Sequence, residues 1–506
     1  MIQAVYYKDI HMTAKVYAAV LSGLDARIVE VEAGMLKGLS AFHIVGLADK
    51  SVDESRQRLT LALKSVSAKP PLRFNAKTII NLAPADEKKE GALLDLPIAL
   101  SFLAVSKQSV VPDKNTIFIG ELGLDGALRK VTGALPLIMG AKKHGFKKIV
   151  LPEENAAEVK YIEGIDIYPE KNLKGVLRLL EEKFSDKPLK IEKFSPPLRA
   201  IDLSYIALPD MLWRAIFIAA AGRHNMLLFG PPGTGKSLIA QHVADLLPPL
   251  TLQEAIEVSS IHSITGLLPE MITHPVMRNP HHSASAVSVL GGGNNPGPGE
   301  ISLAHKGVLF LDEFPEFRRD VLEGLREPLE SSKMAISRAR KKVIFPAEFL
   351  LVGAYNPCPC GFYQDPEKEC TCSPADINRY HKKLSGPILD RMDMHIVIPR
   401  VKSALWFDEH KKMPELPNIM HIQKIQLERQ GTYNSRIHPK DLQRVCFIEK
   451  DAEDMLTSAA DALQLSLRAV HKVMRVARTL ADMEGCSRIE QGHIAESLQY
   501  RNQDKS

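Results

Sequence analysis

The glycine-rich stretch at residues 225–237, NMLLFGPPGTGKS, constrains the fold of this chain more than any other segment. Four apolar residues predict a buried strand at 226–229, and the run at 238–247 predicts a helix after the glycines. The loop between them matches the pattern G-x-x-x-x-G-K-[ST], which requires this strand–loop–helix context. Glycines let the N–H groups of the loop turn inward toward phosphate oxygens, and the helix start adds positive potential there. A glycine-rich turn without a ligand is the alternative, which the Lys-Ser pair disfavours.

The loop predicts a nucleotide site whose ligands are ATP and Mg²⁺. Lys236 is expected to reach the β- and γ-phosphates, and the Ser237 hydroxyl is expected to bind Mg²⁺. The predicted nucleotide-binding residues of the loop are Gly230, Pro231, Pro232, Gly233, Thr234, Gly235, Lys236 and Ser237.

A second apolar run, GVLFLDEFP at residues 307–315, predicts a buried strand that ends in two carboxylates. A Mg-nucleotide site in an open α/β sheet needs acids at the carboxyl end of a strand. We expect Asp312 to hold Mg²⁺ beside Ser237, in part through water, and Glu313 to act as general base for the attacking water. The alternative is a strand that ends in a helix cap, for which one acid is sufficient.

Length and composition indicate an ordinary globular chain of several domains. The 506 residues suggest roughly three domains of about 150 residues each. The net charge of +5 is too small by itself to demand a nucleic-acid partner. No apolar run reaches the ~18 residues of a membrane span, and the N-terminus does not have the pattern of a secretory signal, so a cytoplasmic location without membrane contact is expected. Met12 precedes a regular strand pattern and is an alternative start to Met1.

Four of the six cysteines lie within fifteen residues and follow the pattern C-x-C, nine residues, C-x-C. Two close thiolate pairs on a Pro- and Gly-rich loop suit a tetrahedral metal site, for which Zn²⁺ is the expected occupant. The residues are Cys358, Cys360, Cys370 and Cys372. The spacing is tighter than in the usual zinc knuckles, and four reduced thiols packed in the loop are the alternative.

A basic segment, SSKMAISRARKKVIFPA at residues 331–347, predicts a β-hairpin with a positive tip. The tip residues expected to contact DNA are Arg338, Arg340, Lys341 and Lys342. Such a tip neutralises phosphates and gives salt-dependent affinity that is blind to base sequence. A solvated basic turn is an equally weighted alternative.

Periodicity and the phosphate-loop pattern predict a mixed N-terminal part and an α/β core, and an amphipathic pattern predicts a long helix at 465–483 near the C-terminus. Expected strands of the first part lie at 26–31, 41–45, 77–82, 116–122 and 148–151, and expected helices at 52–66, 94–104 and 135–144. The fold class is therefore multidomain α/β. Its expected divisions are an α+β domain at 1–185, a Pro- and Lys-rich linker at 186–206, a core with a parallel sheet at 207–400 and a helical domain at 401–506.

Several segments resemble the ComM/YifB family of magnesium-chelatase-like AAA+ ATPases. They include GLADKSVDESRQRL, NLAPADEKKEGALLDLPIAL, NPHHSASAVSVLGGGNNPGPGEISLAHKGVLFLDEFPEF, NPCPCG and SGPILDRMDMH. The resemblance covers nearly the whole chain. It implies a Lon-protease-like N-terminal domain, a fold also seen in a ribosomal protein, followed by an AAA+ core and a helical lid. The Lon nucleophile and base positions fall at Leu93 and Pro136, so no peptidase activity is expected.

The resemblance also implies roles for three polar residues. Asn356, after the strand pattern FLLVGAYN, matches the sensor that orients water against the γ-phosphate. Arg391 matches the arginine that reaches the nucleotide of a neighbouring subunit, and Arg468 matches a second sensor that contacts the γ-phosphate in its own chain. Taken alone, Asn356 could cap a turn, Arg391 could pair with a nearby aspartate, and Arg468 could be solvated.

The function implied by the resemblance is that of a homo-hexameric helicase. Such a helicase binds single-stranded or branched DNA and promotes branch migration in recombination during DNA uptake. A protein-remodelling or metal-chelatase-type ATPase is the first alternative, because it uses the same core. A nucleotide-gated scaffold that does no work on DNA is the second. ATPase rates with and without DNA separate the three.

Overall fold

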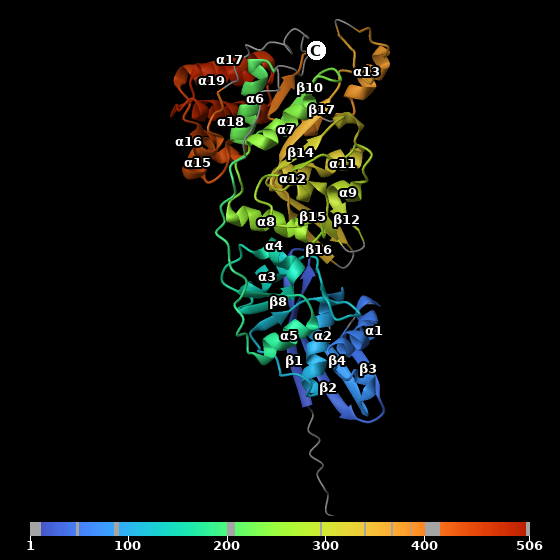
Figure 1. Cartoon of the computed structure of the whole chain (residues 1–506). Coiled ribbons are helices and arrows are strands. Elements are labelled where there is room, and N and C mark those ends of the chain that lie inside the picture. Colours follow the sequence, from blue (N-terminus) through green and yellow to red (C-terminus); the bar gives the residue numbers. More distant parts are fainter. Residues whose placement is uncertain are drawn as a thin grey trace, which may run out of the picture. The chain divides into compact units, whose positions relative to one another are not determined.

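The computed structural model describes residues 12–46, 50–84, 91–199, 208–293, 296–338, 341–365, 368–384, 386–399 and 415–501 (Figure 1). The chain forms two compact units, which are described separately below. The first comprises Met1–Ser195 and Ala255–Ile272, and the second comprises Pro196–Glu254 and Thr273–Ser506. Within the described residues, no helix combines the length and the apolar character that crossing a membrane requires.

The first unit is built on a mixed seven-stranded sheet in the order β3-β4-β2-β1-β5-β8-β9. Its strands are β1 (Met12–Ser22), β2 (Asp25–Lys37), β3 (Ala41–Val45), β4 (Ala76–Ala83), β5 (Thr116–Phe118), β8 (Lys148–Pro152) and β9 (Asp166–Glu170), with the small hairpin β6 (Glu121–Leu122) and β7 (Leu128–Arg129) beside it. Its helices are α1 (Lys50–Ser65), α2 (Asp95–Val105), α3 (Ala134–Lys143), α4 (Ala156–Val159), α5 (Leu173–Glu181) and most of α8 (Leu252–Ser263).

The long hairpin β1–β2 organises this sheet. Its strands pair antiparallel from Met12↔Met35 to Ser22↔Asp25, and Gly23 turns the chain with φ of 66°. The helix α2, DLPIALSFLAV, is buried along its whole length because it is apolar on every side, and it packs on β1 and β2. The strands and helices predicted between residues 26 and 151 are all present, except that the strand predicted at 116–122 divides into β5 and β6.

Residues 185–199, which contain the first part of the predicted linker, form neither helix nor strand. They are nevertheless held to their neighbours, because Leu189 N–H donates to Ile167 O at 2.7 Å and Glu192 N–H donates to Lys160 O at 2.9 Å. These backbone hydrogen bonds fix this stretch of the predicted linker along β9 and the end of α4. The remainder of the predicted linker, residues 200–206, lies outside the described residues.

The second unit contains a five-stranded, wholly parallel sheet in the order β11-β14-β17-β10-β18. These strands are β10 (Met226–Phe229), β11 (Met277–Arg278), β14 (Val308–Leu311), β17 (Leu350–Tyr355) and β18 (Met394–Val397). Its helices are α6 (Asp210–Gly222), α7 (Lys236–Leu246), α9 (Ala286–Leu290), α10 (Glu300–Leu303), α11 (Arg319–Gly324), α12 (Arg326–Ser331), α13 (Pro374–His381) and α14 (Gly386–Leu389), with a small hairpin of β12 (Gly291–Gly292) and β13 (Gly297–Pro298). The parallel sheet predicted for the core is confirmed.

Strand adjacency decides where the predicted site residues meet. β14, β17 and β10 are neighbours and run in the same direction, so their carboxyl ends lie side by side. Asp312 follows β14, Asn356 follows β17 and Gly230 follows β10. Because each of these strands is almost entirely buried, the sheet forms a rigid base beneath that edge.

A basic hairpin extends from the same unit, as predicted. Strands β15 (Lys333–Arg338) and β16 (Lys341–Pro346) pair antiparallel from Lys333↔Pro346 to Arg338↔Lys341. Met334, Ile336, Val343 and Phe345 are buried on one face, whereas Lys342 is exposed. Arg340, one of the expected DNA contacts, lies outside the described residues.

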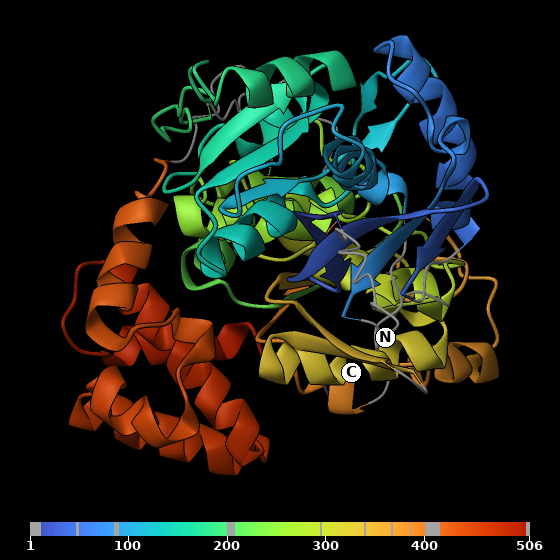
Figure 2. The same ribbon diagram turned by 90° about the horizontal axis from the view of Figure 1, so that it is seen from below.

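The C-terminal part of the second unit is helical, as predicted. It contains α15 (Ile419–Gln430), α16 (Leu442–Cys446), α17 (Lys450–Leu463), α18 (Leu467–Met483) and α19 (Gln491–Gln499), which form one bundle in Figure 2. Ser466 caps α18 by accepting a hydrogen bond from Ala469 N–H. The bundle is joined to the sheet because α18 packs on α6, and Arg501 donates to Met392 O at 2.7 Å just before β18.

Candidate nucleotide-binding site

The loop between β10 and α7 has the backbone that a phosphate cradle requires. Gly233 and Gly235 adopt φ of 78° and 82°, in the left-handed region where residues with a Cβ are strained. Gly230 is needed for a different reason: a Cβ there would lie 2.4 Å from Ile398 O. Thr234 Oγ1 donates to Pro231 O at 2.9 Å and closes the loop on itself. The predicted loop therefore exists with the curvature that its sequence implies.

Lys236, the first residue of α7, places its ammonium inside this loop. Its Nζ donates to Gly230 O at 2.7 Å, to Pro231 O at 2.8 Å and to Asn356 Oδ1 at 3.0 Å. Burial lowers the pKa of Lys236, and the nearby Asp312 opposes that shift. A charged phosphate oxygen can take the place of these neutral acceptors. The buried ammonium is therefore positioned to bind an anion.

The hydroxyl and the carboxylate expected to bind Mg²⁺ face each other. Ser237 Oγ and Asp312 Oδ2 are 3.5 Å apart, on the first turn of α7 and at the end of β14. Hard oxygen donors are what Mg²⁺ prefers, and it usually retains several waters. The residues therefore fit a Mg-nucleotide, in which the ion would neutralise phosphate charge.

Glu313 has a partner that the sequence did not predict. Its backbone lies in the left-handed region with φ of 51°, and its Oε2 lies 2.8 Å from Nδ1 of His282. His282 stacks near His281, with ring centroids 4.2 Å apart. His282 and Glu313 both lie in the segment 279–317 that resembles the family, but their spacing in the sequence does not show that the two side chains meet. The contact places the imidazole where it can orient the expected general base.

Arg391 and Arg468 lie together, but away from the phosphate loop. Both line a pocket of about 330 Å³ whose walls also include Asn225, Arg436, His471 and Arg475. Arg391 forms an ion pair with Glu330. Asn225 immediately precedes β10 and Gly230 immediately follows it, so these two residues are five steps, or about 16 Å, apart along the strand.

The expected contact of Arg468 with the nucleotide of its own chain stays a prediction, and in this structure the residue lines the arginine pocket. The helix α18, which carries Arg468, packs on α6, α15, α16 and α19, at the amino end of β10. Sequence resemblance identified the residue but could not place the helical bundle around the sheet. The structure instead groups Arg468 with Arg391, so we assign the two arginines to one surface.

A buried ion pair forms the floor of the arginine pocket. Asp393 accepts hydrogen bonds from Lys472 Nζ and, at 2.9 Å, from Asn225 N–H. Burial alone would raise the pKa of Asp393, but Lys472 and His224 outweigh it, so the pKa lies below its ordinary value. Asn225 also donates to Arg391 O at 3.3 Å. These contacts fix the backbone of Arg391 to β10, which sequence spacing did not indicate.

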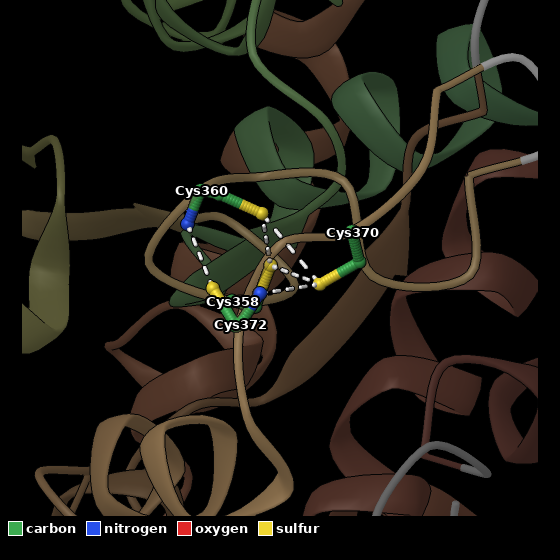
Figure 3. Close-up of side chains that lie close together, drawn as sticks. All are labelled: Cys358, Cys360, Cys370 and Cys372. Atoms are coloured by element: carbon green, nitrogen blue, oxygen red, sulfur yellow. Dashed lines mark hydrogen bonds between the residues drawn. The ribbon is translucent and has the colours of Figure 1, made fainter.

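The four clustered cysteines converge in space (Figure 3). Cys358 Sγ lies 3.3 Å from Cys360 Sγ and 3.7 Å from Cys370 Sγ, and the latter two sulfurs are 3.6 Å apart. All four sulfurs lie within 4.8 Å of one another. Backbone N–H groups of Cys360, Tyr363 and Cys372 point at sulfurs, at 3.3 to 3.4 Å. Such N–H donors stabilise thiolates, which are the form that binds metal.

Comparisons with known proteins agree with this architecture. A family model described as magnesium chelatase, subunit ChlI, matches residues 202–405. A model described as subunit ChlI of Mg-chelatase matches residues 29–155, and one described as magnesium chelatase, subunit ChlI C-terminal, matches residues 417–501. The three matches include much of the first sheet, the phosphate-loop core and the helical bundle.

Individual relatives match along almost the whole chain. Competence protein ComM of Haemophilus influenzae is 40% identical over 96% of this chain and 97% of its own length. The protein YifB of Escherichia coli is 38% identical over 96% of each chain. Shorter matches are DNA repair protein RadA of Aquifex aeolicus, 32% identical over 25% of this chain and 28% of its own, and Lon protease 2 of Bacillus subtilis, 29% identical over 32% of each. The chain is therefore a member of the ComM/YifB family of magnesium-chelatase-like proteins, with an ATPase core of the AAA+ type.

Proposed function

We propose that the chain is an ATP-driven motor that assembles as a homo-hexamer and moves single-stranded or branched DNA in recombination. The observation that carries the proposal is the separation of two half-sites within the second unit. The phosphate loop, Asp312, Glu313 and Asn356 gather at the carboxyl ends of the strands, whereas Arg391 and Arg468 lie at the amino end of β10. A ring of head-to-tail subunits brings the two halves together at each joint.

In this proposal each residue of the first half-site has one task. Lys236 and the N–H groups of the loop bind the β- and γ-phosphates of ATP, and Ser237 and Asp312 would hold Mg²⁺.

The hydrolysis step uses a second set of residues. Glu313 accepts the proton of the attacking water after its carboxylate leaves His282, and Asn356 orients that water. Arg391 of the neighbouring subunit stabilises the charge that develops on the γ-phosphate.

DNA is the proposed substrate for two reasons. The hairpin β15–β16 buries one apolar face and carries a basic tip, which suits a phosphate backbone. The printed names of two relatives also point to DNA, since one is a competence protein and another a DNA repair protein. A chelatase-type or protein-remodelling ATPase would hydrolyse ATP at the same rate with and without DNA, so ATPase rates measured with branched DNA test the proposal.

Reversing the charge of Arg340, Lys341 and Lys342 to Glu is expected to abolish stimulation of the ATPase by DNA and leave basal hydrolysis intact. If the tip contacts three phosphates, the log–log salt slope of single-strand binding should become shallower by about two. Fluorescence anisotropy and phosphate release measure these effects. The matched control reverses Lys424, Arg444 and Lys450, whose side chains are 70 to 75% exposed on the C-terminal helices. Unchanged stimulation in the tip variant would exclude the hairpin as the DNA contact.

For the first unit, we propose a Lon-protease-like fold without peptidase chemistry. The position matching the nucleophile, Leu93, lies in the 3₁₀ helix Ala92–Leu94 and packs on the apolar core. The position matching the base, Pro136, is buried in α3. Neither side chain offers a nucleophile or a proton acceptor, so this unit is proposed to have no peptidase activity.

We also propose that the cysteine cluster holds a structural Zn²⁺. Four sulfurs bound to Zn²⁺ at about 2.3 Å in a tetrahedron lie about 3.8 Å from one another, close to the separations of 3.3 to 3.7 Å between Cys358, Cys360 and Cys370. We expect one Zn²⁺ per chain by mass spectrometry of metals, and none after Cys370 and Cys372 are both replaced by Ser. Protein purified without chelator that contained no thiophilic metal would refute the site.

A further inference from the structure

The cysteine loop lies directly against the phosphate loop. Gly361, between the two cysteine pairs, has φ of 86°, and a Cβ there would lie 2.7 Å from Cδ and 3.0 Å from Cγ of Pro232. Gly361 N–H donates to Cys358 O at 3.0 Å, and Cys358 is fully buried. The turn that brings the first cysteine pair together is therefore the same turn that contacts the middle of the phosphate cradle.

Both ends of the cysteine loop are also tied to the nucleotide site. At its start, Asn356 accepts a hydrogen bond from Lys236. At its far end, α13 returns the chain to the core, where His381 Nε2 lies 2.9 Å from Pro357 O and Lys383 Nζ lies 2.7 Å from Glu316 Oε2. Two of these contacts, Lys236 to Asn356 and Lys383 to Glu316, join the loop to the rest of the core, and the third joins its two ends to each other.

Little apolar burial holds the middle of this loop in place. Tyr363 is 41% exposed, and Gln364, Lys368 and Glu369 are exposed polar residues. Thiols are weak hydrogen-bond donors and acceptors, so four neutral Sγ–H groups provide little cohesion. A metal ion bound to four thiolates would link Cys358 and Cys360, which flank the turn at Gly361, to the second cysteine pair and so help to hold Gly361 against Pro232.

We propose that the metal in the cysteine cluster braces the phosphate loop, so that nucleotide affinity depends on metal occupancy. The inference rests on the proposed nucleotide and zinc sites. With the metal bound, Gly361 limits outward movement of Pro232 and keeps the N–H groups of the cradle aimed at the phosphates. Without the metal, the nucleotide must order the cradle as it binds. Part of the binding free energy is then spent on ordering the loop, so the affinity is lower.

The test measures metal content and the Kd of fluorescently labelled ADP with Mg²⁺ in full-length protein. We expect the double variant Cys370→Ser, Cys372→Ser to lose its metal and to bind ADP at least tenfold more weakly. Gly361→Ala should retain the metal yet bind ADP several-fold more weakly, because its Cβ displaces Pro232. The control Lys424→Ala, at a side chain that is 70% exposed and outside the cluster, should change neither quantity.

The possible results distinguish failure of this inference from failure of the proposed nucleotide site or zinc site. Unmodified protein that bound no ADP would refute the nucleotide site, and unmodified protein without metal would refute the zinc site and this inference with it. If metal is present and ADP binds, but chelator-stripped protein keeps the original Kd, nucleotide affinity does not depend on the metal and the brace alone is wrong. Unchanged affinity in Gly361→Ala would overturn the proposed contact with Pro232. Chelator-stripped protein of the original sequence keeps the inference testable should the cysteine variant fail to fold, which circular dichroism would reveal.

Discussion

Lys236→Ala protein is expected to hydrolyse ATP about 100-fold more slowly, or slower still. The substitution removes the one cation within the phosphate loop that can stabilise negative charge on the γ-phosphate in the transition state. Its Nζ already lies within 3.0 Å of three oxygens of the site, so little reorganisation separates this arrangement from phosphate binding. Phosphate release at saturating ATP measures the effect. The Kd of ADP should rise as well, since the ammonium contacts the β-phosphate in the bound state.

The matched control for this prediction is Lys424→Ala, at a side chain that is 70% exposed. It removes the same charge and side-chain length but should leave both quantities unchanged. Because Lys236 is buried and bonded to loop carbonyls, thermal melting of both variants separates loss of chemistry from loss of fold. Hydrolysis by folded Lys236→Ala protein at the native rate would remove the nucleotide site from the proposed function.

The first half-site could be anticipated from sequence because its parts are contiguous motifs on buried strands. The glycine loop and the Asp312-Glu313 pair each follow a run of four apolar residues, and parallel strands bring their carboxyl ends to one edge. The role of Asn356 was implied by the family resemblance, and its contact with Lys236 follows from the adjacency of β10 and β17. Local sequence patterns are sufficient to predict a site when the strands of one sheet bring its residues together.

Other contacts could not be anticipated because they depend on how loops and helices return to the sheet. His282 meets Glu313 across an insert that has no periodic pattern. Gly361 contacts Pro232 because the cysteine loop folds back onto the phosphate loop. The sequence of the cysteine loop predicted a metal site but did not indicate which residues the loop contacts. The family resemblance identified Arg468, yet the orientation of the helical bundle, set by packing of α18 on α6, decides which surface it reaches.

Arg391→Ala is predicted to lower kcat by about 10³-fold or more while leaving the Kd of ADP unchanged, because an arginine supplied by a neighbour acts on charge that develops only in the transition state. Its side chain is 15% exposed and paired with Glu330 in the pocket at the amino end of β10, away from the phosphate loop of its own chain. Single-turnover hydrolysis and ADP titration separate the two quantities. Arg444→Ala, at a side chain that is 71% exposed, is the matched control.

Mixing two inactive proteins provides the decisive form of this test. Glu313→Gln chains lack the proposed base but supply Arg391, whereas Arg391→Ala chains supply an intact first half-site. In a head-to-tail ring assembled at random from equal amounts, about a quarter of the joints pair an intact cradle with an intact arginine, so the mixture should regain hydrolysis that neither protein has alone. If Arg391 instead served its own chain, every joint would remain defective and mixing would restore nothing. Restoration would therefore show that ATP is hydrolysed between subunits, with the arginine supplied by the surface that also carries Arg468.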